Sequence, residues 1–157
     1  MDIPGTLKHK PVVCLNGYGS ADGKYAGHSD AEGLSLGLAQ WSDRGQVDIS
    51  AKVWRHTGEK WSRQSEELPL HRTLDLALMI IKSLEKVSKA KEDPCFALRD
   101  DAVAFDMQSQ SLTIERCEEN PELNGDVGIF NRELASESGN IHERLKLLSK
   151  ALHGLGY

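Results

Sequence analysis

The chain has 157 residues, of which 39% are hydrophobic and 27% are charged, and its formal net charge at pH 7 is -5. This composition is typical of a globular protein, and the length predicts a single domain over residues 1–157 that buries a core without disulfides or metals. The negative charge argues against broad binding to nucleic acid or to anionic membranes, since both partners favour a basic surface. No apolar run approaches the ~20 residues of a membrane span.

The cysteines also indicate the cellular compartment. Cys14, Cys95 and Cys117 show no C-x-x-C spacing. An odd number of cysteines without paired spacing fits a reducing compartment better than a disulfide framework or a zinc site. The N-terminus lacks the charged-then-apolar pattern of a secretory signal. We therefore expect a soluble, cytoplasmic protein that binds neither nucleic acid nor membrane.

The first element expected along the chain is a strand over residues 11–15, which ends at the turn-forming pair Asn16 and Gly17. From there to Gly33 the chain is dense in glycine, and this composition predicts a structured loop with positive backbone angles at several glycines. The loop contains neither the dinucleotide-binding fingerprint nor the Walker lysine pattern. We expect no nucleotide and no other cofactor.

The same loop contains a candidate metal site. His28, Asp30 and Glu32 alternate, and Asp22 lies a few residues earlier. In an extended segment alternate side chains point to one side, where an imidazole and carboxylates can bind a divalent metal. Residues 27–32 are similar to the G-H-S-D-A-D signature of the methylerythritol cyclodiphosphate synthase family, whose histidine is a metal ligand. The D-x-H pair that completes the metal site of that family is absent, so the hypothesis for Asp22, His28 and Asp30 depends on their spacing alone.

Residues 34–66 predict a three-stranded antiparallel meander. Aliphatic residues alternate on both sides of a turn signal at residues 43–46, namely Leu34, Leu36, Leu38, Val47, Ile49, Ala51 and Val53. If Leu36 pairs with Val53 and Leu38 pairs with Ala51, every aliphatic side chain lies on one face of the sheet. We predict this register.

A second turn at residues 57–60 places His56 opposite Trp61 and Trp54 opposite Arg63. The opposite face of the sheet then carries all the tryptophans together with basic side chains: Trp41, Lys52, Trp54, His56, Trp61 and Arg63. Tryptophan and arginine are enriched at binding hot spots, so this face predicts a ligand groove or the interface of a self-associating homodimer. The alternative is a second core, covered by the remaining elements of the chain.

After Pro69, apolar residues recur at helical spacing up to Val87 and occupy much of the circumference of the helix. This pattern predicts a long buried helix, packed on the aliphatic face of the sheet. Its first turn contains His71 and Arg72, although the start of a helix favours negative charge.

Two explanations for these basic residues remain open. Glu66 and Glu67, immediately upstream, can neutralise them. Alternatively, Arg63, His71 and Arg72 form an anion site with the free helix amides and bind a phosphate or carboxylate.

The rest of the chain completes an α+β pattern. Residues 103–114 predict a hairpin that pairs Met107 with Leu112 and Phe105 with Ile114. Residues 118–125 predict a loop, residues 127–130 a short strand, and residues 140–155 a C-terminal helix that ends at Gly154 or Gly156. The predicted fold is an antiparallel sheet of about five or six strands, packed with one long buried helix and the C-terminal helix.

No arrangement in the sequence identifies a nucleophile, its base and an orienting group, so no catalytic residue is assigned. Two classes of function remain. The first is a small binding module that self-associates through its tryptophan-bearing face. The alternative is a small enzyme or sensor that acts on an anionic metabolite.

Overall fold

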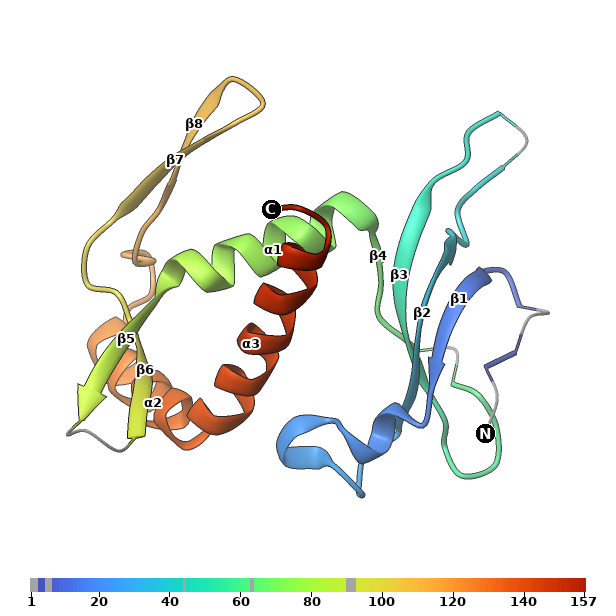
Figure 1. Ribbon diagram of the computed structural model, residues 1–157, viewed down its shortest axis with the longest axis horizontal. Coiled ribbons are helices and arrows are strands. Elements are labelled where there is room, and N and C mark those ends of the chain that lie inside the picture. The colour runs from blue at the N-terminus through green and yellow to red at the C-terminus, as the bar shows by residue number, and fades with distance from the viewer. Residues whose placement is uncertain (1–2, 5–6, 44, 63, 90–92) are drawn as a thin grey trace. The chain divides into compact units, whose positions relative to one another are not determined.

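The structure is a computed structural model, and it describes residues 3–4, 7–43, 45–62, 64–89 and 93–157. Helices and antiparallel sheets are both present, which confirms the mixed α+β class (Figure 1). By its internal contacts the chain divides into two compact units, Met1–Ala77 and Leu78–Tyr157. The expectation of a single domain stays a prediction.

The first unit is built on a four-stranded antiparallel sheet whose strands lie in chain order (Figure 1). The strands are β1 (Lys10–Asn16), β2 (Ala31–Leu38), β3 (Ile49–Arg55) and β4 (Glu67–Pro69). Between β1 and β2 the glycine-rich loop forms two short 3-10 turns, η1 (Tyr18–Ser20) and η2 (Gly23–Tyr25). Gly17, Gly23 and Gly27 have positive φ, as predicted, and glycine adopts this conformation without a steric penalty.

The pairing of β2 with β3 differs from the predicted register by two residues. Leu36 pairs with Ala51 rather than Val53. The connection between β2 and β3 accommodates the shift of two residues, because the Ser42 amide donates to the Ala39 carbonyl at 3.0 Å and forms an additional turn before the hairpin loop. Since the shift is even, the aliphatic side chains still share one face of the sheet.

The third strand of the meander also differs from the prediction. His56 pairs with Trp61 as expected, whereas Arg63, the expected partner of Trp54, lies outside the described residues. Farther along β3, Lys52 pairs with Glu67 of β4. Pro69 ends β4, which is an edge strand, where the missing proline N–H is tolerated.

The core of this unit lies on the tryptophan-bearing face of the sheet, which reverses the expected arrangement. Trp54 is 1% exposed, and Ser35 and Ser50 on the same face are buried. On the aliphatic face, Leu36 and Ile49 are 38% and 50% exposed. The sequence predicted a helix over the aliphatic face, and for the tryptophan-bearing face it predicted either a binding surface or a second core.

The N-terminal segment explains this reversal, because it covers the tryptophan-bearing face. A Cβ atom at Gly33 would lie 2.7 Å from Ile3 Cδ1, so the missing side chain makes room for Ile3. His9 is fully buried, and its ring lies edge-on to Trp54 with 5.7 Å between the ring centroids. Covering of this face by other elements of the chain was one of the two expectations, and the sequence did not identify the covering element.

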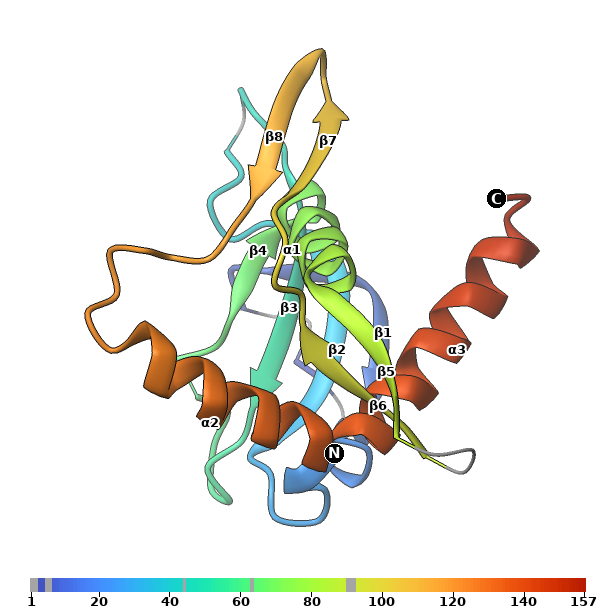
Figure 2. The same cartoon turned by 90° about the vertical axis from the view of Figure 1, so that its left-hand side faces the viewer.

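The second unit contains two antiparallel hairpins and two helices. Its elements are β5 (Leu84–Lys89), β6 (Asp93–Leu98), β7 (Val103–Met107), β8 (Gln110–Ile114), α2 (Leu123–Ser136) and α3 (Ser138–Gly154). Figure 2 shows α2 and α3 running in different directions from their junction at Glu137. The Ser138 hydroxyl accepts from the Phe96 amide at 3.0 Å, and the Asn131 side chain accepts from the Leu98 amide at 2.8 Å. These two bonds attach β6 to the helices.

Several expected elements differ in this part of the chain. The predicted helix over residues 70–87 is α1 (Leu70–Ser83), and the residues after it form β5. The boundary between the units falls within α1. No residue of α1 is buried, whereas the sequence predicted a buried helix. Residues 127–130, predicted as a strand, lie inside α2. Because helical and strand periods are hard to separate in a short apolar run, tertiary packing decides the outcome there.

The β7–β8 hairpin forms with a register shifted by two residues from the prediction. Phe105 pairs with Leu112 rather than Ile114. Its two-residue turn is formed by Gln108 and Ser109, whose φ values are 51° and 62°. Positive φ at both positions is the signature of a type I′ turn, whose twist matches that of the strands.

No helix in the described part of the chain is long and apolar enough to cross a membrane.

The close approach of β1 to Gly37 predicts a specific loss of stability. A Cβ atom at Gly37 would lie 2.1 Å from the Lys10 carbonyl oxygen, which is backbone and cannot move aside. We expect Gly37→Ala to lower the free energy of unfolding by about 2 kcal/mol or more in urea titrations. Gly45→Ala is the control, because the nearest atom to its Cβ is a side-chain oxygen at 3.5 Å. Equal stability of the two variants would contradict the described packing.

Candidate functional site

Two of the tryptophans line one pocket in the first unit, with a volume of about 550 Å³. The lining residues come from the N-terminal segment (residues 4 and 7–9), from β3, and from the loops after β2 and β3. The lining residues are Pro4, Leu7, Lys8, His9, Gln40, Lys52, Trp54, Trp61 and Ser62. We call this the indole pocket.

The aromatic wall of the indole pocket is formed by β3 and its hairpin. Pairing of His56 with Trp61 brings the Trp61 ring edge-on to Trp54, with 6.0 Å between the ring centroids. The His56 ring contacts Trp61 in the same way at 5.1 Å. Lys52 Nζ lies 4.8 Å from the centroid of the Trp54 ring, which is a cation–π distance.

A buried carboxylate lies beside this wall. The Glu67 side chain is 1% exposed, and its Oε2 accepts from Lys52 Nζ at 3.2 Å. Its Oε1 accepts from the Gln40 amide and the Ser50 hydroxyl, both at 2.8 Å, and lies 3.1 Å from His9 Nδ1. Burial raises the pKa of a carboxyl group, but these four donors together hold the pKa of Glu67 below its ordinary value of 4.5.

His9 connects this carboxylate to the middle of the sheet. Its Nε2 lies 3.0 Å from Ser35 Oγ, which in turn accepts from the Trp54 indole N–H at 2.8 Å. Because the ionised Glu67 carboxylate can only accept, the proton that faces it is assigned to Nδ1. The imidazole therefore attaches the N-terminal segment to β2, β3 and β4.

The order Ser35, His9, Glu67 is that of the hydroxyl–imidazole–carboxylate chain of serine hydrolases. A catalytic hydroxyl must face its substrate, however, and Ser35 is not among the described residues that line the indole pocket. Its oxygen is also occupied by the Trp54 indole. The chain of bonds positions His9 and does not present a nucleophile.

The structure brings together four of the six side chains predicted for the binding face: Lys52, Trp54, His56 and Trp61. Arg63 lies outside the described residues. Trp41 lies elsewhere, because the turn after Ala39 takes the chain out of β2 before residue 41. Trp41 is 41% exposed, and its indole N–H donates to Asp48 Oδ2 at 2.7 Å.

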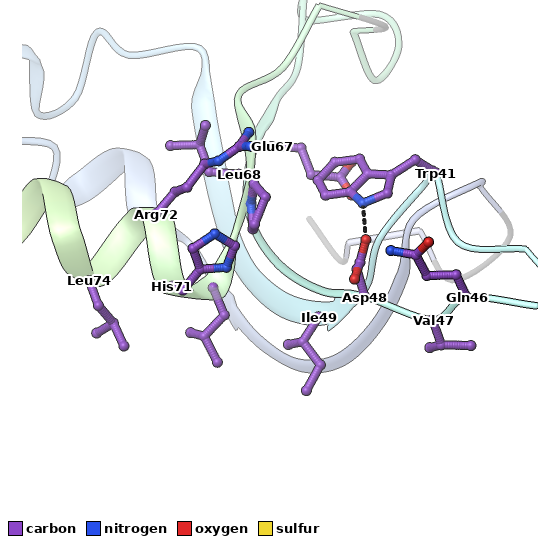
Figure 3. Close-up of a pocket in the computed structure, with 12 residues that line it drawn as sticks. Trp41, Gln46, Val47, Asp48, Ile49, Glu67, Leu68, His71, Arg72 and Leu74 are labelled. Atoms are coloured by element: carbon purple, nitrogen blue, oxygen red, sulfur yellow. Dashed lines mark hydrogen bonds between the residues drawn. The ribbon is translucent and has the colours of Figure 1, made fainter. Parts of the chain in front are cut away.

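Trp41 lines a second pocket of about 710 Å³ at the start of α1 (Figure 3). Its lining includes His71 and Arg72, the two described members of the predicted anion site, and both are exposed. Among the described residues, neither upstream glutamate forms an ion pair with them, and neutralisation by these glutamates stays a prediction. Glu66 pairs with Arg55 at 2.6 Å, and Glu67 is the buried partner of Lys52.

The predicted metal ligands in the glycine-rich loop have separate partners. Asp22 Oδ2 accepts from the Ser29 hydroxyl at 2.5 Å, Asp30 forms an ion pair with Arg55, and His28 is exposed. Among the described residues, no group of three or more His, Cys, Asp or Glu side chains is placed to hold a metal ion. The metal hypothesis has no geometric support here.

Sequence reasoning missed Ser50, Glu67 and His9 as members of the site. The alternation of β3 places Ser50 on the face of Trp54, so a polar residue in a strand centre was a usable signal. The cross-strand position of Glu67 required the β3–β4 register. Nothing in the sequence near His9 indicates that it lies under the sheet.

The fold and the pocket define a mixed α+β protein with a buried ion pair beside an aromatic cavity. The whole chain, residues 1–157, matches the model of a family described as "Family of unknown function (DUF6530)", and the protein belongs to this family. No curated protein and no solved structure matches it.

The buried carboxylate predicts a specific pH dependence of stability. Because the pKa of folded Glu67 is below 4.5, its ionised form stabilises the fold above about pH 4.5, and this contribution is lost as the pH falls through the folded pKa. We expect Glu67→Gln to lower the free energy of unfolding at pH 7 by about 3 kcal/mol, because it leaves Lys52 buried without a counter-ion. It should also flatten the decline between pH 5 and pH 3.

Urea unfolding midpoints measured across this pH range test both statements. The control is Glu59→Gln, which alters an exposed residue of the 57–60 turn and should leave the midpoint at pH 7 unchanged. A Glu67→Gln protein as stable as the wild type at pH 7 would show that the buried ion pair makes no net contribution.

Proposed function

We propose that the protein is a binding module that takes a small ligand in the indole pocket. The observation that carries the proposal is the convergence of Trp54, Trp61 and Lys52 on one cavity. A volume of about 550 Å³ lies within the range of small-molecule sites, which is roughly 300–1,000 Å³. Such sites combine an apolar wall with a few placed polar groups, and the indoles and the ammonium supply both.

The burial of Trp54 favours a small ligand over a protein partner at this face. A ring that is 1% exposed contributes little area to an interface with a second chain. Replacing it with alanine would remove a core side chain, at about 3–5 kcal/mol, and would not report on binding. Trp61 is half-buried, so it is the residue whose removal tests the pocket. The homodimer expected from the sequence stays a prediction.

A second candidate is an anionic ligand in the pocket at the start of α1. The observation that favours it is the lack of an ion-pair partner for His71 and Arg72 among the described residues. Within the same lining, Asp48 accepts from the Trp41 indole (Figure 3), and the carboxylate of Glu67 is paired with Lys52. This is the location that the sequence predicted for an anion.

A thermal-shift screen of small metabolites with Trp61→Ala distinguishes the two pockets. A ligand at about 100 times its Kd stabilises the native state by about 2.7 kcal/mol, which raises the Tm of a chain of this size by about 5–10 °C. We expect hits on the wild-type protein to lose their shift in Trp61→Ala and to keep it in the control variant Trp41→Ala.

Loss of the shift in Arg72→Ala but not in Trp61→Ala would place the ligand in the pocket at α1. No shift with any compound at millimolar concentration would count against both candidates.

A further inference from the structure

The ammonium of Lys52 retains hydrogen-bonding capacity toward the indole pocket. An ammonium has three donors, and one goes to Glu67 Oε2 at 3.2 Å. The face of Trp54 lies 4.8 Å away on another side. The side chain is 9% exposed, and Lys52 is one of the residues that line the pocket. A ligand acceptor in the pocket would satisfy the remaining donor capacity of the ammonium.

The other polar groups of the pocket also favour a ligand that accepts hydrogen bonds. Lys8 adds an exposed ammonium at the N-terminal side, and no acidic side chain is among the described residues that line the cavity. The one carboxylate nearby, Glu67, is already saturated by its four donors. Ser62 Oγ accepts from the Gln64 amide at 3.1 Å, which leaves its own proton to donate. The pocket therefore favours a ligand that accepts hydrogen bonds and carries negative charge.

The geometry also limits the charge and shape of the ligand. The pocket offers one buried ammonium, with neither an arginine nor a helix N-terminus among the described lining residues, and doubly charged phosphates are usually recognised by those groups. Because Lys52 is already paired with Glu67, the excess positive charge of the described lining is the single charge of Lys8, and one excess charge matches a single carboxylate. Trp61 and Leu7 both contribute apolar surface to the lining, and the indole ring suits packing against a flat group.

We infer that the ligand is a flat, aromatic monocarboxylate whose carboxylate accepts from Lys52 while its ring packs on Trp61. This inference rests on the proposed function of the indole pocket and names the chemical class that the pocket selects.

Matched probes that differ only in the polar group test the inference. Phenylacetate, phenylacetamide and phenethylamine share one ring, and indole-3-acetate, indole-3-acetamide and tryptamine form a larger set. We expect the carboxylates to bind the full-length protein roughly tenfold or more tighter than the amides, by calorimetric or fluorescence titration, because a charge-assisted bond is lost in the amide. The amines should bind most weakly.

The role of Lys52 is tested by removing its charge. Lys52→Met alone leaves Glu67 buried without a partner and can unfold the protein, so the double variant Lys52→Met, Glu67→Gln, which is neutral at both positions, is measured as well. We expect the preference for carboxylates to disappear in whichever of these variants folds, and to remain in the control Lys10→Met, an exposed position on β1.

Each other outcome overturns the inference in a recognisable way. Equal binding of acids, amides and amines that is lost in Trp61→Ala would leave the pocket as the binding site but remove its selectivity for carboxylates. A preference for carboxylates that survives in the double variant would show that Lys52 does not recognise the ligand. Binding of none of the probes at millimolar concentration would overturn the inference together with the proposed function.

Discussion

The first unit depends on one buried carboxylate. Glu67 enters β4 from the chain that returns after the second hairpin, and its oxygens bind donors from β3, from the loop after β2 and from the N-terminal segment. A charge taken out of water is tolerated only when every strong acceptor site is filled, so these parts of the chain must assemble together. The same requirement fixes Lys52 against Trp54 and thereby shapes one wall of the indole pocket.

The periodicity of the sequence determines which side chains share a face of a sheet, but it does not determine the register of the strands. Alternation predicted which side chains share a face, and this is correct for β2, β3 and the β7–β8 hairpin. Both predicted registers were shifted by two residues, because the turns set the register, and the conformations of Ser42 and of Gln108 with Ser109 are local properties that hydrophobicity does not encode. An even shift leaves every face intact, so the pattern alone could not reveal it.

The sequence predicted only in part which face of the sheet in the first unit is buried. Aliphatic residues indicated one side of the sheet as the core, yet the polar side is buried because Ile3 and His9 cover it from a distant part of the sequence. Four of the predicted binding residues do meet, since His56 and Trp61 are fixed by a local hairpin. The long-range members of the site, His9 and Glu67, depend on contacts between segments that no local signal connects.

The position of α1 has a consequence for how the protein unfolds. The helix runs across the boundary between Ala77 and Leu78, so each unit contains one part of it. If one unit unfolds, the part of α1 that belongs to the other unit is well below the ~12 residues at which isolated helices become stable, and this part frays. Cleavage at this boundary would therefore leave each fragment with an incomplete helix at its new end.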